Sequence, residues 1–175
     1  MHPEFERFLN MTYLGSPVKD LITVNYAFLA LPYHHASWIP HRLLPYIIDQ
    51  CLSPTNNKCY YKEYMNFTFD IRDQFLEFTN TTYDNLQSWW INQVNSKFDW
   101  NLYDLRAVYN RNTTVDPHNS EMRSRAMWKY AADQGVFATP TAFVNGIHLQ
   151  NMPWTAEEWL QLLTDVSKSQ KVTWL

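Results

Sequence analysis

Histidines are the side chains of this sequence best suited to chemistry, and two of them adjoin in LPYHHASW, residues 31–38. An imidazole can move a proton near neutral pH or bind copper or zinc. In the predicted helix His34 and His41 lie two turns apart, and His148 follows in a much later segment. These three are the candidates for a metal site, but no cysteine or carboxylate near residues 31–38 completes a ligand pattern. The simpler interpretation is that His34 and His35 are polar residues at the beginning of a helix, and no bound metal or cofactor is expected.

The two cysteines of the chain, Cys51 and Cys59, flank the polar segment LSPTNNK. Their spacing matches neither the C-x-x-C motif of redox proteins nor a zinc knuckle. We therefore expect a structural disulfide, which stabilises a folded chain by roughly 2–3 kcal/mol in an oxidising compartment. Two unpaired thiols are the alternative.

Acceptor sequences for N-linked glycans, of the form N-x-[ST], point to the same kind of compartment. They begin at Asn10, Asn66, Asn80 and Asn112. Together with the cysteine pair, they predict a glycoprotein that is secreted or resides in the lumen of the endomembrane system. No signal peptide is visible at Met1.

Composition and charge exclude several classes of protein. The 175 residues are 46% hydrophobic and 18% charged, which predicts one folded domain with a substantial core. The net charge is −3 and Lys and Arg do not cluster, so nucleic acid and anionic membranes are not expected partners. The longest apolar stretch, residues 21–32, is too short to span a bilayer and is interrupted by Asn25.

The first half of the chain predicts two strands and a bent helix. Residues 18–31 are rich in β-branched and aromatic side chains, as in a buried strand. Apolar residues recur at helical spacing across residues 34–50, where Pro40 and Pro45 are expected to bend the helix. In YMNFTF, residues 64–69, apolar and polar side chains alternate, which favours a half-buried strand.

The second half predicts helices followed by a hairpin. Residues from about 70 to 134 carry apolar stripes of helical period, and Gly135 is expected to end the last of these helices. The Asn-Ser pair at 119–120 can cap its beginning. The Asn-Gly pair at 145–146 predicts a tight turn between two short strands. A capping box that begins at Thr155 opens the final helix.

The stretch DQGVFATPTAFVNGIHL, residues 133–149, resembles the DsbA-like branch of the thioredoxin-fold superfamily. In that family a helix end, a loop with a cis-proline and a hairpin follow one another at this spacing. The resemblance implies an α/β fold, namely a single thioredoxin-fold domain over residues 18–175 with an inserted helical subdomain over about 70–134. Residues 1–17 are then an N-terminal tail.

The same resemblance implies two functional segments. One is the turn that carries two cysteines in redox-active relatives, and the other is the cis-proline loop, whose backbone pairs with an extended peptide. In this sequence the turn is Leu31, Pro32, Tyr33 and His34, and the loop is Thr139, Pro140 and Thr141. Because both cysteines of the turn are replaced, dithiol chemistry is not expected there.

The sequence therefore predicts a non-catalytic or chaperone-like module that binds an extended peptide or a partner protein at the former active-site groove. An equal alternative is that the groove persists only because the fold requires its geometry. Two other functions fit the sequence less well. A residual thiol-disulfide oxidoreductase or glutathione-dependent enzyme lacks a nucleophile at Leu31, and Ser37 comes a helical turn too late. A histidine-based metal-binding protein is the remaining candidate.

Overall fold

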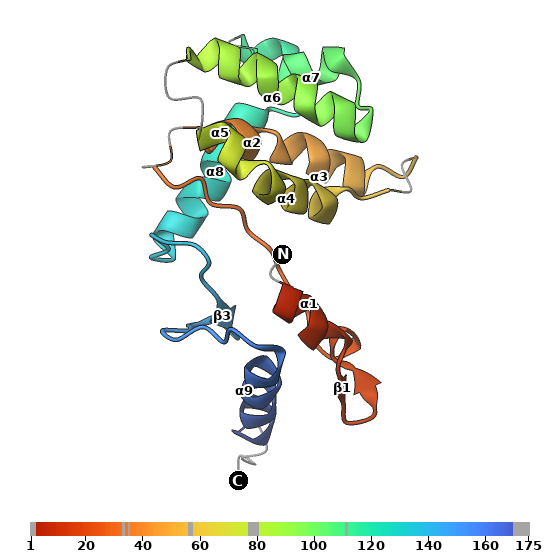
Figure 1. The fold of residues 1–175 in the computed structure, drawn as a ribbon, viewed down its shortest axis with the longest axis vertical. Coiled ribbons are helices and arrows are strands. Elements are labelled where there is room, and N and C mark those ends of the chain that lie inside the picture. The colour runs from red at the N-terminus through yellow and green to blue at the C-terminus, as the bar shows by residue number, and fades with distance from the viewer. Residues whose placement is uncertain are drawn as a thin grey trace. The chain divides into compact units, whose positions relative to one another are not determined.

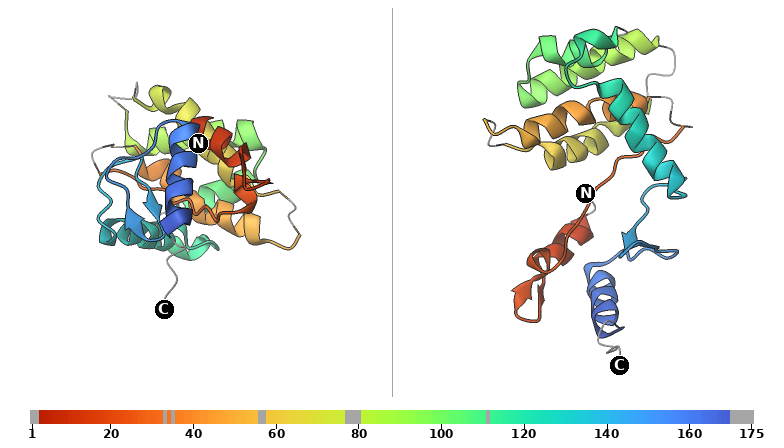
Figure 2. Two further views of the ribbon diagram at one scale, coloured as in Figure 1. Left: turned by 90° about the horizontal axis from the view of Figure 1, so that it is seen from below. Right: turned by 180° about the vertical axis from the view of Figure 1, so that it is seen from behind.

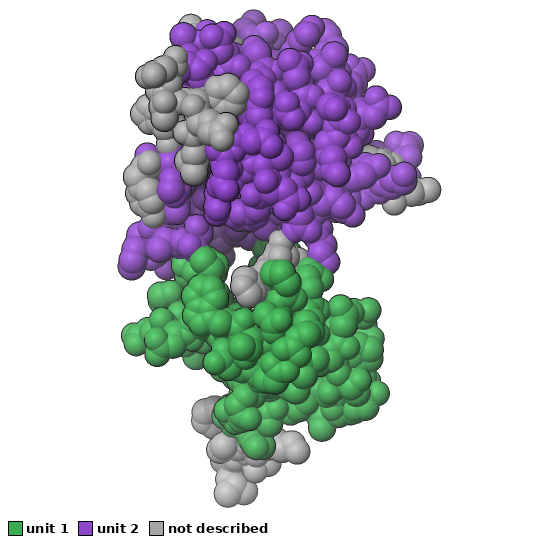
Figure 3. Space-filling model, in the orientation of Figure 1, with its two compact units in different colours: residues 1–26, 140–175 green, residues 27–139 purple. Residues whose placement is uncertain are grey.

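The computed structural model describes residues 3–32, 34, 36–55, 58–76, 81–110 and 112–169. The chain divides into two compact units, residues 1–26 with 140–175 and residues 27–139 (Figures 1 and 3). Helices make up 59% of the described chain, and its strands form two sheets of two strands each, so α and β elements are both present but helices build most of the fold. None of the described helices is long and apolar enough to cross a membrane.

The unit of residues 27–139 is a helical assembly. In chain order it contains α2 (Trp38–Arg42), α3 (Leu44–Leu52), α4 (Tyr61–Asp70), α5 (Arg72–Leu76), α6 (Tyr83–Phe98), α7 (Leu102–Val108), the 3-10 helix η2 (Thr113–Val115) and α8 (Ser120–Asp133). The pairs α3–α4 and α6–α7 each lie side by side, and α8 packs against α2 and α3 (Figures 1 and 2). Helices thus occupy the range predicted to be helical, about 70–134, and extend well before it.

Large rings fill the core of this unit. Trp90 and Tyr64 are completely buried, and their ring centroids lie 5.9 Å apart. Phe98 stacks on Trp100 at 4.5 Å and meets the ring of Phe67 edge-on at 5.5 Å. Such pairs add to the free energy of apolar burial, and here they join α4 to α6. The high aromatic content of the sequence therefore serves the core.

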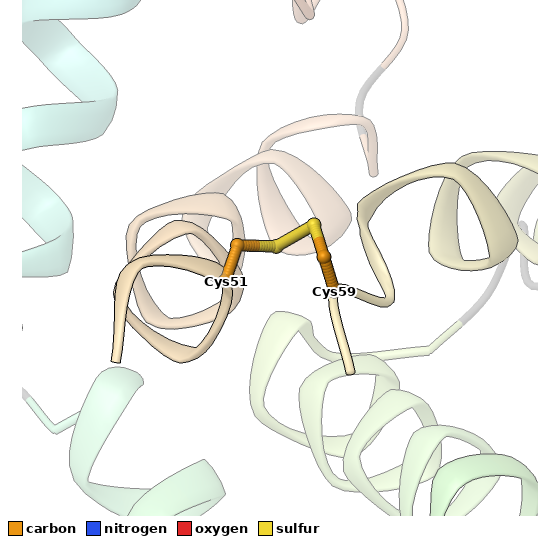
Figure 4. The surroundings of a disulfide bond; sticks show 2 residues. All are labelled: Cys51 and Cys59. Atoms are coloured by element: carbon orange, nitrogen blue, oxygen red, sulfur yellow. A yellow bond between two sulfur atoms is a disulfide. The ribbon is translucent and has the colours of Figure 1, made fainter. Parts of the chain in front are cut away.

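A disulfide between Cys51 and Cys59 joins the last turn of α3 to the segment before α4 (Figure 4). The two Cα atoms are 4.2 Å apart, and Cys51 packs against the aromatic core. The predicted bridge is confirmed. Because the chain has only two cysteines, no thiol is left for other chemistry.

The other unit is built around two helices from opposite ends of the chain. It contains α1 (Pro3–Asn10), β1 (Thr12–Tyr13), β2 (Ser16–Pro17), the 3-10 helix η1 (Val18–Asp20), β3 (Phe143–Val144), β4 (Ile147–His148) and α9 (Ala156–Ser169). Trp159 of α9 lies 4.9 Å from the ring of Phe5 and 6.0 Å from that of Phe8. Glu4 accepts a hydrogen bond from the Ala156 N–H at 3.1 Å, which satisfies one of the donors at the beginning of α9 that have no acceptor within the helix. Where a tail was predicted over residues 1–17, the structure thus has a helix that contributes to this core.

The predicted end of α8 is confirmed. Gly135 has a φ of +73°, a conformation that glycine adopts without strain. Its N–H donates to the Ala132 carbonyl at 2.9 Å, and the Val136 N–H donates to the Ala131 carbonyl at 3.1 Å. This pair of bonds is the Schellman arrangement that terminates helices.

The predicted hairpin and final helix are also confirmed. β3 and β4 pair antiparallel around Asn145 and Gly146, whose φ angles of +50° and +80° suit a type I′ turn. At the beginning of α9, the Glu158 N–H donates to the Thr155 hydroxyl at 3.2 Å, and the Glu158 carboxylate accepts from the Thr155 N–H at 3.1 Å. These reciprocal bonds are the expected capping box.

The strand predicted within residues 18–31 is wrong. This range forms η1 and then an irregular segment, and no strand of the described chain pairs with it. Only Val18, Ala30 and Leu31 are buried in it. β-Branched residues favour a strand only when a neighbouring strand completes its hydrogen bonds and covers one face. The thioredoxin sheet implied by the resemblance would require this strand.

The strand predicted over residues 64–69 is wrong as well, because these residues lie in α4. Tyr64 and Phe67 are buried and Phe69 is exposed, which is the pattern of one helix face rather than of alternation. The bend predicted in residues 34–50 is present, since α2 and α3 are separate helices that meet at Leu43. However, the helix begins at Trp38, four residues later than predicted.

Removing the disulfide is expected to lower the free energy of unfolding by about 2–3 kcal/mol, because the sequence separation of 8 residues closes a short loop in the unfolded chain. Urea unfolding of the Cys51→Ser, Cys59→Ser double variant, followed by tryptophan fluorescence, measures this loss. The wild type with its disulfide reduced is the matched control and should unfold at the same urea concentration as the variant. A variant as stable as the oxidised wild type would contradict a stabilising role for the bridge.

Candidate functional site

The turn predicted to replace the redox motif is closed by its own hydrogen bonds. The Ser37 hydroxyl lies 2.8 Å from the His34 carbonyl and 3.2 Å from that of Leu31, and the His34 N–H donates to Leu31 at 3.0 Å. Leu31 is buried, Pro32 and His34 are exposed, and Tyr33 lies outside the described residues. Because α2 begins after Ser37, His34 does not stand at a helix N-terminus, and that prediction is wrong.

The three histidines considered as metal ligands differ in their surroundings. His34 and His148 are exposed, and the ring of His148 lies 5.2 Å from that of Phe143 on β3. His41 is only 1% exposed, and its Nε2 donates to the Ser124 carbonyl at 3.1 Å. Within the described part of the chain, no three His, Cys, Asp or Glu side chains are grouped so that they could hold a metal ion. His41 therefore packs in the interior of its unit and, among the described residues, belongs to no group of possible metal ligands.

Polar contacts, here called the α8 seam, hold α8 against the elements before it. They join Trp128 Nε1 to the Ala30 carbonyl at 2.9 Å, His41 to the Ser124 carbonyl at 3.1 Å, Arg42 to Glu121 at 3.2 Å, and Arg123 to Asp49 at 2.7 Å. The α8 residues that face this contact are small and polar, since Ser120 and Ser124 are completely buried. An apolar stripe could not have marked this face of α8 in the sequence.

Asp49, His118 and Arg123 form the Asp49 cluster, which the sequence did not reveal. His118 Nδ1 donates to one carboxylate oxygen of Asp49 at 2.7 Å, and Arg123 donates to both oxygens at 2.7 and 2.8 Å. The Tyr46 ring meets the His118 ring edge-on at 5.0 Å. Asp49 is separated from its partners by 69 and 74 residues, so no local spacing pattern could have joined them.

The electrostatics of the Asp49 cluster favour the ionised carboxylate. Burial alone would raise the pKa of Asp49, but the hydrogen bonds from Arg123 and His118 outweigh burial and lower that pKa. A carboxylate on Nδ1 leaves Nε2 as the basic nitrogen of the imidazole, as in general bases. The same contacts dock α8 on α3, and this structural role accounts for every one of them.

The predicted cis-proline loop leads into β3, whose outer edge is open. Pro140 is exposed and Thr141 half-buried. The register pairs Val144 with Ile147 next to the turn, so Phe143 and His148 form the pair that is not hydrogen-bonded. The backbone N–H and C=O of Phe143 consequently point away from β4, and the described chain contributes no other strand to this edge.

Three of the four predicted glycosylation sites lie in the described residues, and all three are exposed. Asn10 ends α1, Asn66 lies in the middle of α4, and Asn112 precedes η2. Asn80 lies outside the described residues. Exposure meets the steric requirement of a glycan, while occupancy stays a prediction.

Comparison of the chain with family models, with characterised proteins and with solved structures found no match. The likeness to DsbA-like proteins therefore stays a prediction, and function must be argued from the geometry of the chain itself.

The buried His41 is expected to make stability depend on pH. Burial lowers the pKa of His41 below its usual 6.5, so the unfolded chain binds a proton that the folded chain does not. The free energy of unfolding should therefore be highest above about pH 6.5 and fall below it, by up to about 1.4 kcal/mol per pH unit. Urea unfolding of the wild type and His41→Gln across this range measures the effect, since Gln keeps a donor for the Ser124 carbonyl but does not titrate. Parallel pH curves for the two proteins would refute it.

Asp49→Asn is expected to lower the free energy of unfolding by about 1–2 kcal/mol, because Arg123 and His118 lose a charged acceptor. The lowered pKa of Asp49 sets the sign of the pH dependence: the difference in unfolding free energy from the wild type is complete above the usual value of 3.8, and it is lost as pH falls below 3.8 and through the lower pKa of the folded protein. Denaturant titrations at several pH values test both parts. Asp73→Asn is the matched control, since the Asp73 side chain is 80% exposed and, among the described residues, forms an ion pair with its neighbour Arg72 alone. Equal losses of unfolding free energy in Asp49→Asn and Asp73→Asn would contradict a stabilising role for the Asp49 cluster.

Proposed function

We propose that the protein is a non-catalytic module that binds an extended segment of a partner protein along the outer edge of β3. The observation that carries this proposal is the open backbone edge at Phe143, in a sheet of only two strands. Unpaired N–H and C=O groups at a sheet edge are a template for a further strand, and many peptide-binding domains use this mode.

Apolar side chains on the hairpin support the same function. Phe143 is 38% exposed and Ile147 is 70% exposed, and the pleat places them on opposite faces of the hairpin. A strand added at β3 would direct alternate side chains toward each of these faces. Backbone hydrogen bonds would then supply affinity, and the two exposed apolar surfaces would favour segments with apolar residues.

The proposal keeps from the DsbA-like resemblance the proline loop and the hairpin, and not the thioredoxin sheet, because the strand that this sheet would require over residues 18–31 is absent. Its support is the order of elements after residue 131: a helix ended by Gly135, an exposed Thr139 and Pro140, a hairpin and a last helix. In the family that the sequence resembles, the residue before the proline pairs with peptides. Thr139 suits this role, because its backbone groups form no hydrogen bond with any described residue.

The disulfide supports the non-catalytic part of the proposal and the predicted compartment. Both cysteines are bonded to each other between α3 and α4, while the residue at the former nucleophile position, Leu31, is buried. A thiol-dependent enzyme would need an accessible thiolate. A bridged pair and exposed glycosylation sequences fit a secreted or lumenal protein.

The binding edge is tested with a short, capped, fluorescein-labelled peptide of alternating Val and Thr, whose affinity is measured by anisotropy. Phe143→Pro removes the outward N–H and the ring, and it should weaken binding by about tenfold. Phe143→Ala, which keeps the N–H, should lose less affinity for the peptide than Phe143→Pro. Pro140→Ala should also bind the peptide more weakly than the wild type does. His148→Pro is the matched control because it removes an N–H from the opposite edge, on β4, and it should bind as the wild type does.

Equal binding by Phe143→Pro and His148→Pro would refute an added strand at β3, as would the absence of binding to any of a panel of such peptides. Reduction of insulin disulfides by the wild type above the background rate, lost in Cys51→Ser, would refute the non-catalytic assignment.

A further inference from the structure

We propose that, of the three acceptor sequences in the described residues, Asn112 is the preferred site of N-linked glycosylation when this chain passes through a secretory pathway. The inference concerns a modification rather than the binding edge, and it shares with the proposed function only the export of the chain. Three of the four acceptor sequences can be compared directly, because the structure places them in a loop, a helix and a helix end.

The sequence Asn112-Thr113-Thr114 forms a turn that brings the two required side chains together. Asn112 Oδ1 accepts a hydrogen bond from the Thr114 hydroxyl at 2.8 Å and another from the Thr114 N–H at 3.2 Å. The turn begins at Asn110, whose side chain accepts from the Asn112 N–H at 2.8 Å. Both Asn112 and Thr114 are exposed. The acceptor amide and the hydroxyl that defines the sequence are thus presented side by side.

The Nδ2 atom of Asn112 is the atom that would be modified, and no described residue accepts a hydrogen bond from it. Attachment of a sugar there would break no hydrogen bond to a described residue. The amide oxygen would keep both of its bonds to Thr114. The glycan would leave the surface between α7 and α8, where the chain forms loops and η2.

The other two described sequences are less suited to modification. Asn66 and Thr68 lie within α4, where residues two apart do not face each other, and the Thr68 hydroxyl donates to the Met65 carbonyl at 2.6 Å. At Asn10, the Nδ2 atom already donates to the Glu6 carbonyl at 2.9 Å, within α1. Modification of Asn10 would therefore remove or displace a bond that Asn112 does not make.

The group transfer uses a polyprenyl-diphosphate-linked oligosaccharide as the donor. A bond forms between Asn112 Nδ2 and C1 of the first sugar, and the bond between C1 and the diphosphate oxygen breaks. The electron pair of that bond leaves with the polyprenyl diphosphate. One Nδ2 proton passes to a base of the transferase, so no oxidant or reductant is needed.

The test is to express the full chain behind a signal peptide in a eukaryotic secretory host and to map the glycans on total protein, secreted and cell-associated. Release by peptide N-glycosidase in heavy-oxygen water converts each modified Asn to a labelled Asp, which mass spectrometry locates. We expect higher occupancy at Asn112 than at Asn10 and Asn66, and a loss of the Asn112 glycan in Asn112→Gln. Asn10→Gln, Asn66→Gln and Asn80→Gln are matched controls and should leave the Asn112 glycan in place.

Two substitutions at Thr114 distinguish the loss of the hydroxyl from a failure of the chain to fold. Thr114→Ser keeps the hydroxyl and should retain the glycan, whereas Thr114→Ala should lose it, with the same circular dichroism spectrum for both proteins. An unmodified Asn112 in the wild type, higher occupancy at Asn10 or Asn66 than at Asn112, or a persistent glycan in Thr114→Ala would each overturn the assignment. Peptide binding at β3 is measured separately, so either proposal can fail without the other.

Discussion

Hydrogen bonds across the α8 seam are the constraint on which the helical unit depends. His41 and Ser124 exchange a buried hydrogen bond, and Asp49 holds Arg123 at hydrogen-bonding distance. A shift of α8 by one residue would rotate its side chains by about 100° and break these bonds together. A buried polar group left without a partner costs about 1–3 kcal/mol, and hydrogen bonds are lost when the geometry departs from a narrow range of distance and angle. The seam therefore selects the register of α8, while the aromatic core supplies most of the burial.

A buried carboxylate fixes the segment that leads into α8. Asp116, which is almost completely buried, accepts hydrogen bonds from the Ser120 N–H at 2.7 Å and the His118 N–H at 3.0 Å. It thus provides the cap that the sequence assigned to residues 119–120, while Asn119 has a φ of +47° and no capping bond of its side chain. The bond from its N–H to Asp116 positions His118, and the His118 ring reaches Asp49. The loop that contains Asn112 therefore leads into the first turn of α8, whose position these bonds fix.

Features that depend on residues close together in the sequence could be predicted from it. Gly135, the Asn-Gly turn at 145–146 and the capping box at Thr155 each act within a few residues, and each was placed correctly. The pairing of the cysteines followed from their number and spacing. The strand over residues 18–31 was not predictable in this way, because a strand depends on a partner elsewhere in the chain. The Asp49 cluster and the α8 seam likewise join residues far apart in sequence, and their polar side chains form no apolar periodic pattern.

The disulfide has a consequence for how the chain matures. With only two cysteines, one intramolecular pairing exists, so oxidative folding cannot pass through a wrongly paired monomer. The bridged residues are close in sequence, and their collision in the nascent chain does not require the helices on either side to be packed. Maturation therefore requires an oxidant for one bond, with no need for a disulfide isomerase to correct it.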